Sequence, residues 1–412
     1  MRAGLRVGLV ALVVAACANG PILANPPAPR PLIAPPTARP TRAPDPLPIV
    51  LPRDDGPHDR LTEWWYYTGH LQAHQSDIRQ RAGTYSLGRR YGFEFVIFRA
   101  ERGGFPTTWA SHLAVTDETG GTFHYAQRTQ VGDAVDRSPR DDDDAPTGFD
   151  LALTGADPTL SPTLEHPPWE MSGGDGTDKL WAMLGPDEAA SASVPSMVLS
   201  LGLESRKPPA LHDRDGWIDF GPGGGSYYYS RTDMEAKGHL TIGDETFQVG
   251  GTAWFDHQWG DFISVGGGGW DWFAMNLDDG TDLTLSLVRD ADGTYPLIYG
   301  TLVRPDGTTE HLGADAFTVR TTRHWTSPAT GAEYPAGWSI DIPGERLSID
   351  LTPTVAAQEL DTRATTGVVY WEGSQDVTVR RGPDRKVTGG QAYVELTGYA
   401  PAGVAPAPSI AP

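Results

Sequence analysis

The sequence predicts an all-β protein built from two antiparallel barrels or sandwiches. Short runs of β-branched, aromatic and alternating residues recur along the chain, Asp-Gly and related turn signals separate them, and no long amphipathic helix interrupts them. Gly and Pro together make up about a fifth of the 412 residues, against a usual share of roughly an eighth. This composition disfavours coiled coils and long helical bundles.

The first 16 residues have the form of a signal peptide. Arg2 and Arg6 precede an apolar run over residues 7–16, which is shorter than the roughly 20 residues that span a bilayer. The run ends in Val-Ala-Ala before Cys17, a lipobox-like pattern that predicts lipidation of Cys17. We therefore expect an exported lipoprotein anchored at the cell envelope, in the periplasm or at the extracellular face. An ordinary secretory signal with an incidental Cys17 is the alternative.

Cys17 is the only cysteine, so we expect no disulfide, no multi-cysteine zinc site and no catalytic thiol in the folded part. Residues 17–50 are rich in Pro, Ala and Arg, a composition that favours extended conformations and cannot bury a core. This segment is predicted to be a linker that holds the folded part away from the membrane.

The strand runs begin soon after residue 54. The clearest are TEWWYYTGHLQA, YGFEFVIFRA, WASHLAVTD, SYYYSRTD, HLTIGDETFQVGGTAWF, WDWFAMNL, TDLTLSLVRD, LIYGTLVRPDG, AFTVRTTRHW, WSIDIP, RLSIDLTP, VVYWEGSQDVTVR and AYVELTGY. The number of runs fits two domains better than one, over residues 51–262 and 263–400, followed by a disordered tail over 401–412. The segment 132–168, with the acidic run Asp141–Asp144, is expected to be a solvated loop.

The charge balance excludes one class of partner. Lys and Arg number 32 against 53 Asp and Glu, which gives a formal charge of −21. Nucleic-acid binding needs an excess of clustered Lys and Arg to neutralise phosphates. We therefore expect no nucleic-acid partner.

Three clusters combine aromatic and ionisable residues, and the strand period assigns their faces. In EWWYY, Glu63, Trp65 and Tyr67 should share one face; in WFDHQWGD, which begins at Trp254, His257 and Trp259 should share one. In WDWF, Asp271 should face away from Trp270 and Trp272. A carboxyl group among aromatic rings has a raised pKa and can donate a proton, and the rings can stabilise a cation.

Other readings of these clusters remain open. Trp and Tyr in strands are usually core residues, and a buried Glu, His or Asp often only satisfies neighbouring N–H and O–H groups. A metal site built on His257 lacks any His-x-His or HExxH spacing, so we expect no metal and no other cofactor. No Gly-x-Ser-x-Gly elbow is present, which removes the commonest serine-hydrolase signature.

At these clusters the chain resembles a known family. The motifs are GPHDRLTEWWYYTGHL, RRYGFEF, KPPALHDRDGW, SYYYSRT, VGGTAWFDHQWGDF, GWDWFAMNLDDGTDL, TSPATGAEYPAGWSIDIP, YWEGSQDV and YVELTGY. Together, over residues 54–399, they resemble the AttH-like secreted hydrolases, which are related to the CrtC-like carotenoid 1,2-hydratases. The resemblance implies two lipocalin-like β-barrel domains, an apolar ligand site between or within them, and an export signal.

The related hydratases add water across an end-group double bond of an acyclic carotenoid without a cofactor. The resemblance carries their His-x-Trp onto His257 and Trp259 and their acidic Asp onto Asp271. The sequence departs from the hydratase pattern at Gly269, where a Tyr would be expected two residues before Asp271.

Three hypotheses for function follow. In the first, a cofactor-independent enzyme hydrates or cyclises an isoprenoid-like or carotenoid-like molecule; Asp271 is the acid, His257 and Trp259 assist, and substrate contacts come from Glu63, Trp65, Tyr67, Trp254, Trp270 and Trp272. This mechanism requires Asp271 to reach the pocket unpaired with Arg. In the second, the protein is a non-catalytic lipid or pigment carrier. In the third, it is a hydrolase of unknown substrate.

Overall fold

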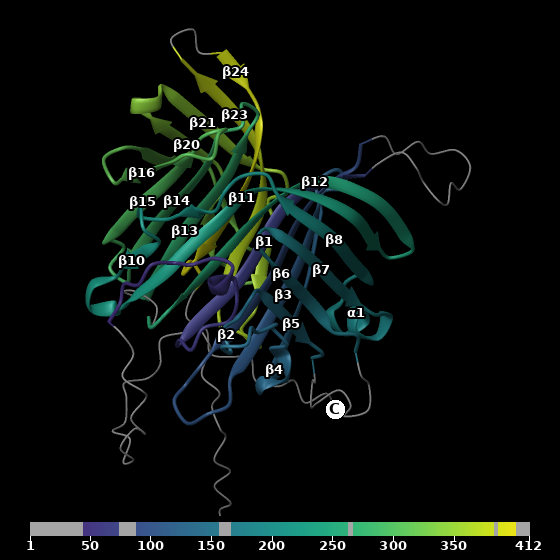
Figure 1. Ribbon diagram of the computed structural model, residues 1–412. Helices are drawn as coiled ribbons and strands as arrows, with labels where there is room; N and C mark the ends of the chain where they lie inside the picture. The colour runs from purple at the N-terminus through teal and green to yellow at the C-terminus, as the bar shows by residue number, and fades with distance from the viewer. Residues whose placement is uncertain (1–43, 74–87, 156–165, 263–266, 383–385, 401–412) are drawn as a thin grey trace, which may run out of the picture.

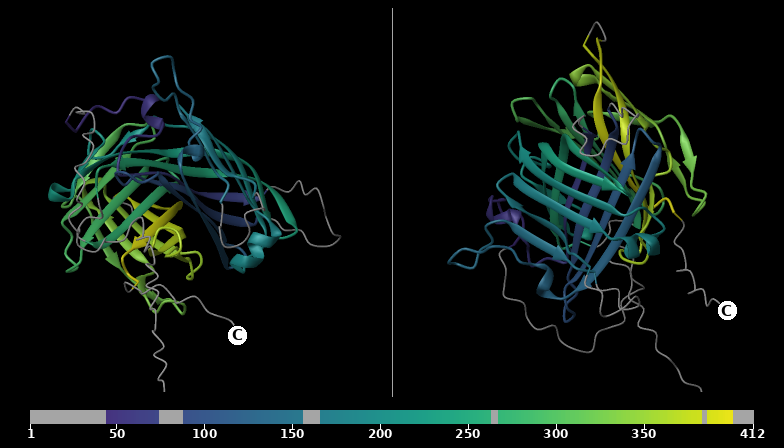
Figure 2. Two further views of the ribbon diagram at one scale, coloured as in Figure 1. Left: turned by 90° about the horizontal axis from the view of Figure 1, so that it is seen from below. Right: turned by 90° about the vertical axis from the view of Figure 1, so that its right-hand side faces the viewer.

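The computed structural model describes residues 44–73, 88–155, 166–262, 267–382 and 386–400. Within these ranges the chain forms two large antiparallel sheets, and each is curled into a barrel-like shell (Figures 1 and 2). Strands from Thr62 to Gly260 build the first sheet and strands from Gly267 to Thr397 build the second. The all-β prediction with two antiparallel barrels is confirmed.

The first sheet has the order β4-β3-β2-β1-β12-β11-β8-β7-β6-β5, with β9 and β10 also pairing with β11. Its strands are β1 (Thr62–Ala73), β2 (Arg90–Ala100), β3 (Thr108–Asp117), β4 (Thr122–Val131), β5 (Phe149–Leu153), β6 (Trp169–Gly174), β7 (Thr177–Leu184), β8 (Met197–Ser205), β9 (Ala210–Leu211), β10 (Trp217–Asp219), β11 (Gly225–Ile242) and β12 (Glu245–Gly260).

The second sheet has the order β16-β15-β14-β13-β25-β23-β21-β20-β17, with β22 and β24 also pairing with β23. Its strands are β13 (Gly267–Leu277), β14 (Asp282–Asp290), β15 (Leu297–Val303), β16 (Thr309–Gly313), β17 (Thr318–Thr321), β20 (Trp338–Ile342), β21 (Leu347–Pro353), β22 (Glu359–Asp361), β23 (Val369–Arg381), β24 (Lys386–Thr388) and β25 (Gly390–Thr397). A separate hairpin pairs β18 (His324–Thr326) with β19 (Glu333–Pro335).

Helical structure is sparse in the described ranges. It consists of α1 (Pro186–Ala192) and the short 3-10 helices η1 (Arg53–Asp55), η2 (Asp133–Val135), η3 (Gly221–Gly223) and η4 (Pro343–Glu345). None of the described helices has the length and apolar character needed to cross a bilayer.

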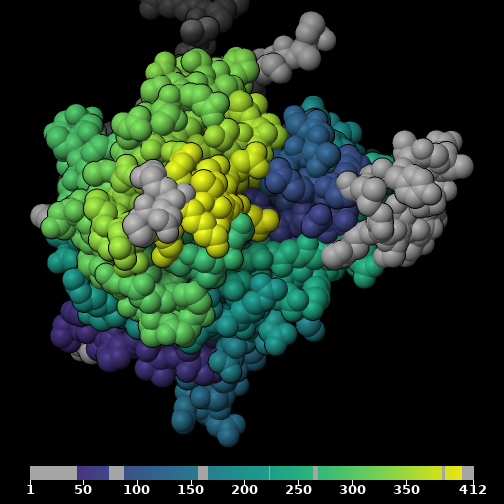
Figure 3. Space-filling model, turned by 90° about the horizontal axis from the view of Figure 1, so that it is seen from above, coloured from purple at the N-terminus to yellow at the C-terminus, as the bar shows by residue number. Residues whose placement is uncertain are grey.

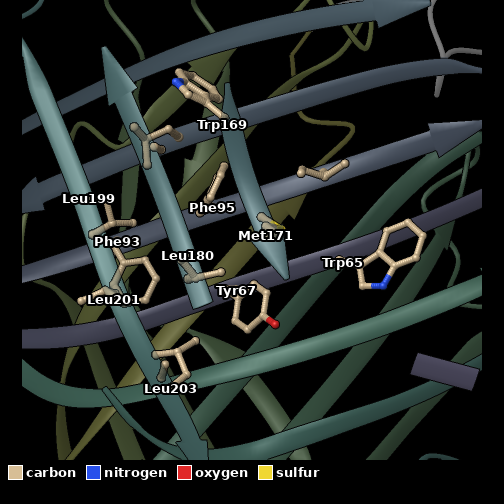
Figure 4. Close-up of a cluster of buried hydrophobic side chains, with 14 of the residues drawn as sticks. Trp65, Tyr67, Phe93, Phe95, Trp169, Met171, Leu180, Leu199, Leu201 and Leu203 are labelled. Atoms are coloured by element: carbon tan, nitrogen blue, oxygen red, sulfur yellow. The ribbon is translucent and has the colours of Figure 1, made fainter. Parts of the chain in front are cut away.

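Each sheet encloses its own apolar core. Figure 4 shows part of the first core, where Trp65 and Tyr67 of β1 lie among side chains from β2 and from β6, β7 and β8 on the opposite wall. The second core lies inside the second sheet and includes Phe273, Trp338 and Trp371. The strands thus place one side-chain face toward the lumen of their barrel, as the period of two requires.

Arg128 bridges the two edges of the first sheet. It projects from edge strand β4, is 4% exposed, and donates hydrogen bonds to the carbonyl of Leu153 on edge strand β5 (3.2 Å) and to the carbonyl of Pro167 (2.7 Å). Its guanidinium also forms a two-pronged ion pair with Glu188 of α1 (2.7 and 2.6 Å) and lies 4.4 Å from the ring centre of Trp169. These contacts give a partner to the Leu153 carbonyl on the open edge and to the Pro167 carbonyl just before β6.

The two barrels pack against each other through their outer faces. β1 and β2 of the first sheet contact β25 and β23 of the second, and Figure 3 shows the C-terminal strands in direct contact with the N-terminal ones. A third apolar cluster fills this contact, formed by Tyr66, Val96, Trp254, Trp272, Ala274 and Tyr393. The strands at the contact are therefore buried on both faces.

Two local expectations need correction. The predicted loop over 132–168 contains β5, whose five residues pair with β6. The last part of the predicted linker, from Pro44, packs on the first barrel: Ile49 contacts the core, and the Leu47 N–H donates to the Tyr227 hydroxyl (2.7 Å). Both segments contain spaced apolar residues that pack against the core of the first barrel. The predicted signal peptide, Cys17, most of the linker and the tail over 401–412 lie outside the described residues.

We predict that Arg128→Met lowers the free energy of unfolding by about 3–5 kcal/mol, because it leaves Glu188 and the Leu153 and Pro167 carbonyls without their buried partner. Arg137→Met is the matched control. Arg137 pairs with Asp150 and Glu170, but its side chain is 45% exposed, so the loss should stay below about 1 kcal/mol. Urea denaturation measures both, and equal losses would contradict the role assigned to Arg128.

Candidate functional site

The aromatic motifs divide between two environments because successive side chains point to opposite faces. On β1, Glu63, Trp65 and Tyr67 face the interior of the first barrel, whereas Trp64 and Tyr66 face the second barrel. The shared face predicted for Glu63, Trp65 and Tyr67 is confirmed. Residues that were expected to share one pocket therefore lie in different places, some inside the first barrel and others at the contact with the second.

The interior face of the first barrel holds a hydrogen-bonded His-Glu-His cluster. Glu63 lies between His58 and His257: its Oε1 is 2.7 Å from His58 Nδ1 and 3.0 Å from His257 Nε2. The ring of Trp259 stacks on His58 with centres 4.1 Å apart, and the ring centre of His257 lies 4.7 Å from that of Trp65. Glu63 and His257 are completely buried.

The electrostatics of this cluster favour a structural ion pair. Burial opposes the charged form of His58, but the carboxylates of Glu63 and Asp54 outweigh it and raise the His58 pKa. Burial likewise opposes ionisation of Glu63, but the two histidines lower the Glu63 pKa to about 2. Burial lowers the pKa of His257, so this ring stays neutral and donates to Glu63.

The same three residues form a group of possible metal ligands. Among the described residues, ligand atoms of His58, Glu63 and His257 lie within 4.8 Å of one another. However, His58 Nδ1 and His257 Nε2 both lie at hydrogen-bond distance from Glu63 Oε1. The other ring nitrogen of His257, Nδ1, is buried without a partner among the described residues. A histidine that binds a metal normally donates its second N–H to an oxygen. The arrangement therefore fits a hydrogen-bonded cluster better than a metal centre.

The other predicted residues of this face are also tied into the barrel interior. Tyr67 donates its hydroxyl proton to Asp178 (2.9 Å), and Trp65 Nε1 donates to the Asp55 carbonyl (3.0 Å). Figure 4 shows Trp65 and Tyr67 among aliphatic side chains of the core. None of the predicted residues Glu63, Trp65, Tyr67, His257 and Trp259 lines the cavity described below.

Asp271 lies inside the second barrel, on the face of β13 opposite to Trp270 and Trp272. This opposition is as predicted, but it also directs Asp271 away from the two tryptophans. The Asp271 carboxylate accepts the Tyr399 hydroxyl (2.9 and 3.0 Å) and lies 3.4 Å from the Arg289 guanidinium. Burial raises the Asp271 pKa to about 6, against the influence of Arg289. The mechanism expected for Asp271 required it to be free of Arg, and that condition is not met.

A cavity of about 110 Å³ lies between the two barrels. Its walls are largely aromatic and come from β1, β2, β11 and β12 on one side and from β13, β14, β15, β23 and β25 on the other. The lining residues are Trp64, Tyr66, Glu94, Phe98, Phe220, Tyr228, Asp256, Gln258, Phe262, Gly269, Trp270, Trp272, Ser286, Val288, Tyr299, Tyr370 and Glu395. Trp270 and Trp272, two of the predicted substrate-binding residues, are among them. Trp254 lies behind this wall, with its ring centre 6.2 Å from that of Trp272.

Three glutamates converge at this contact from different strands: Glu94 and Glu372 are buried, and Glu395 is partly buried. Glu94 is on β2, Glu372 on β23 and Glu395 on β25; Glu372 and Glu395 are cross-strand partners. Tyr370 is hydrogen-bonded to Glu94 (2.8 Å) and Tyr66 to Glu372 (2.7 Å). In the described chain, no Arg or Lys forms an ion pair with any of the three.

Burial without a cation favours the neutral form of these carboxyl groups. It raises the pKa of Glu94 to about 8, with Glu395 adding a like charge, and that of Glu395 to about 7 against a hydrogen bond from Trp270. Burial and the repulsion of Glu94 and Glu395 raise the pKa of Glu372 well above its usual range. Carboxylic acids that stay protonated near neutral pH can act as proton donors.

Asp256 on β12 is in a different electrostatic state. Trp254 Nε1 and the Tyr228 hydroxyl donate to its carboxylate (both 2.7 Å), and the Ser230 hydroxyl also donates to it. The Tyr228 oxygen in turn accepts from Trp272 Nε1 (3.0 Å), so its own proton points to Asp256. Burial raises the Asp256 pKa only to about 6 because these donors favour the anion. The cavity therefore combines neutral acids with one carboxylate.

The site residues predicted from the sequence do not include Glu94, Glu372 or Glu395. Each stands as an isolated acid within an apolar strand, in YGFEFVIF, YWEGS and AYVEL. The one feature of the sequence that could have indicated them is a single acidic residue, without a neighbouring Lys or Arg, inside an apolar strand. That the three meet depends on barrel packing, since more than 270 residues separate Glu94 from Glu372 along the chain.

Comparison with known proteins agrees with this architecture. A model of the AttH-like family matches residues 42–399. The chain belongs to the AttH-like family. The crystal structure of an AttH-type protein from Nitrosomonas europaea is similar, with 28% identity over 86% of this chain and 98% of that chain and a TM-score of 0.66.

A second solved structure shares the fold at low identity. Kievitone hydratase from Nectria haematococca is 14% identical over 87% of this AttH-like chain and 94% of its own, with a TM-score of 0.61. No protein among those with curated descriptions matches the chain significantly.

We predict that Glu94→Gln flattens the pH dependence of stability. The folded protein keeps a proton on Glu94 up to a pKa of about 8, whereas the unfolded chain releases it near its usual 4.5. The folded state therefore binds more protons between these values, so this contribution is fully present below pH 4.5 and is lost as pH rises toward 8. The slope of unfolding free energy against pH should become less negative by about 1.4 kcal/mol per pH unit.

Urea denaturation at a series of pH values between 5 and 8 measures this slope. Glu204→Gln, an exposed glutamate on β8, is the control and should leave the slope of the wild type unchanged. A Glu94→Gln slope equal to that of the wild type would show that Glu94 is ionised when folded.

Proposed function

We propose that this AttH-like protein is a cofactor-independent enzyme that protonates an apolar, unsaturated small molecule in the cavity between the barrels. Hydration or cyclisation of an isoprenoid-like or carotenoid-like end group is the reaction that this chemistry serves best. The observation that carries the proposal is Glu395: a partly buried carboxyl group that lines an aromatic cavity, has a pKa of about 7 and has no cationic partner among the described residues.

Glu395 is suited to be the acid because of its position and its pKa. It lies opposite Trp272 of β13 in the sheet register and accepts a hydrogen bond from the Trp270 side chain. A general acid works best when its pKa is near the working pH, because it is then protonated and still a ready donor. The Asp256 carboxylate on the other wall of the cavity helps to keep Glu395 neutral, because its negative charge raises the Glu395 pKa.

The reaction balances without any bound cofactor. The Glu395 carboxyl proton forms a C–H bond as the alkene π bond breaks, which leaves a carbocation and the Glu395 carboxylate. The faces of Trp64, Trp270 and Trp272 and the anion of Asp256 stabilise that cation. Water then adds to the cation and returns a proton to Glu395, or a second double bond of the substrate closes a ring and a proton is lost to Glu395.

The size of the cavity supports recognition of an end group. A volume of about 110 Å³ is smaller than the 300–1,000 Å³ typical of sites that enclose a whole drug-sized ligand. We infer that one end of a longer apolar molecule enters between the barrels. A non-catalytic carrier is the second candidate, because the aromatic walls alone would hold such a ligand; the buried acids would then have no role.

Export and membrane anchoring are proposed on sequence grounds alone. The signal-like residues 1–16 and the lipidation candidate Cys17 support an envelope lipoprotein. The described chain begins at Pro44 and packs on the first barrel from there, so residues 18–43 would be the span available between a lipid at Cys17 and that barrel.

We predict that Glu395→Gln lowers product formation roughly 10²- to 10⁴-fold, because glutamine cannot donate the proton. Purified protein lacking residues 1–17 is incubated with an apolar extract of the host and analysed by untargeted mass spectrometry. A product heavier by one water indicates hydration, and an unchanged mass with altered retention indicates cyclisation or isomerisation.

Asp271→Asn is the matched control variant. Asp271 is a buried carboxyl group whose pKa is raised, as that of Glu395 is, but it faces the interior of the second barrel. Loss of product in Asp271→Asn but not in Glu395→Gln would overturn the proposed acid. A ligand that co-purifies unchanged with all three proteins would indicate a carrier. Thermal melts confirm that each variant is folded.

A further inference from the structure

A chain of hydrogen bonds leads from Gln127, near the surface, to Glu94. The bond at the outer end determines which atom donates in each bond that follows. Gln127 on β4 donates its side-chain Nε2 proton to the backbone carbonyl of Asp361 (2.9 Å), which can only accept. The Gln127 amide is therefore oriented, and its Oε1 faces Thr365 Oγ1 at 2.7 Å. The single hydroxyl proton of Thr365 must point to this acceptor or to the Thr362 carbonyl (3.2 Å).

The same reasoning fixes which ring nitrogen of His112 donates and which accepts. Its Nε2 lies 3.1 Å from Thr365 Oγ1, which has already used its proton, so Nε2 carries the hydrogen and donates. His112 is fully buried, no carboxylate in the described ranges forms an ion pair with it, and burial lowers its pKa to about 3. The ring is therefore neutral, and Nδ1 is a bare acceptor 2.7 Å from the Tyr370 hydroxyl.

Tyr370 has one proton and two neighbours. It must donate to His112 Nδ1, so its oxygen is left to accept from Glu94 Oε1 at 2.8 Å. Only a protonated carboxyl group can donate there. We infer that Glu94 is held as a neutral acid whose proton is committed to Tyr370, so that Oε2 is left as an acceptor and selects a ligand with a hydroxyl group.

The surroundings of Glu94 agree with a neutral group from every side. β23 contributes Tyr370 and Glu372, β25 contributes Glu395, and β3 contributes the neutral His112. Tyr66 of the adjacent strand β1 is bound to Glu372. His112 is neutral, and the other titratable groups of this set are anions when charged, which would repel an ionised Glu94.

Glu94 Oε2 lacks a partner within the described protein. It is a buried oxygen with no hydrogen bond, and Glu94 lines the cavity between the barrels. Buried acceptors are normally satisfied, so the missing donor is assigned to a molecule that occupies the cavity. The inference rests on the proposed function in taking this cavity as the ligand site, and it adds the ligand class: a largely apolar molecule with a hydroxyl near the end that enters.

The test compares phenol with toluene, which has nearly the same shape but no hydroxyl, by calorimetric titration of the intact protein. An apolar pocket without an acceptor would favour toluene, because the phenol hydroxyl would lose its water. With Oε2 as the acceptor, phenol should bind about fivefold or more tightly than toluene. Tighter binding of toluene to the wild type would overturn the inference, and this comparison needs no variant.

Two substitutions test the protonation state. Glu94→Gln imitates the neutral acid, since its amide N–H can donate to Tyr370 and its carbonyl oxygen replaces Oε2; the preference for phenol should persist. Glu94→Met removes both functions, and the preference should disappear or reverse. A Glu94→Gln protein that favours toluene, as Glu94→Met should, would show that an ionised Glu94 is required.

The outcome is separable from the proposed catalysis. The same titrations in a Glu395→Gln background remove the proposed acid but keep Glu94, so the preference for phenol should remain. Loss of the phenol preference with intact turnover would refute the inferred hydroxyl-bearing ligand but not the proposed catalysis. Full activity of Glu395→Gln together with an intact phenol preference would sink only the acid catalysis.

Discussion

Burial of both faces of a few long strands is the constraint on which the rest of this structure depends. β1, β12 and β13 each place alternate side chains into a barrel lumen and the others into the contact between barrels. Where the barrels meet, neither face of these strands is solvated, so every polar side chain there needs a hydrogen-bond partner or must lose its charge. The aromatic density of the motifs follows from this, because large rings fill both sides.

The polar groups meet this constraint in different ways, and the difference creates the chemistry. In the first barrel, Glu63 keeps its charge by binding two histidines. In the contact, Asp256 keeps its charge through three donors. Among the described residues, Glu395 has the Trp270 side chain as its one donor, and Glu94 faces Tyr370. The groups with few donors hold their protons to higher pH, so the cavity contains acids and a carboxylate within one aromatic enclosure.

Alternation along single strands was predictable and is confirmed: Glu63, Trp65 and Tyr67 share a face, and Asp271 opposes Trp270 and Trp272. Which of those faces borders a cavity was not predictable. The rings beside His257 suggested a ligand pocket, but that space is a packed barrel interior. The glutamates that do border the contact appeared in the sequence only as isolated acids in apolar runs, without a motif to relate them.

The sequence by itself determined the fold class, the turns between strands and the opposite faces of neighbouring residues, because these depend on local geometry with a period of two. Only the tertiary structure decided that three strands bring Glu94, Glu372 and Glu395 together. It also decided that Asp271 pairs with Arg289 and accepts a hydrogen bond from Tyr399. The physical reason is that a carboxyl group's charge depends on the donors and cations that reach it across the fold. Some of those partners come from strands more than a hundred residues away, as Tyr399 does for Asp271, and local pattern does not encode their approach.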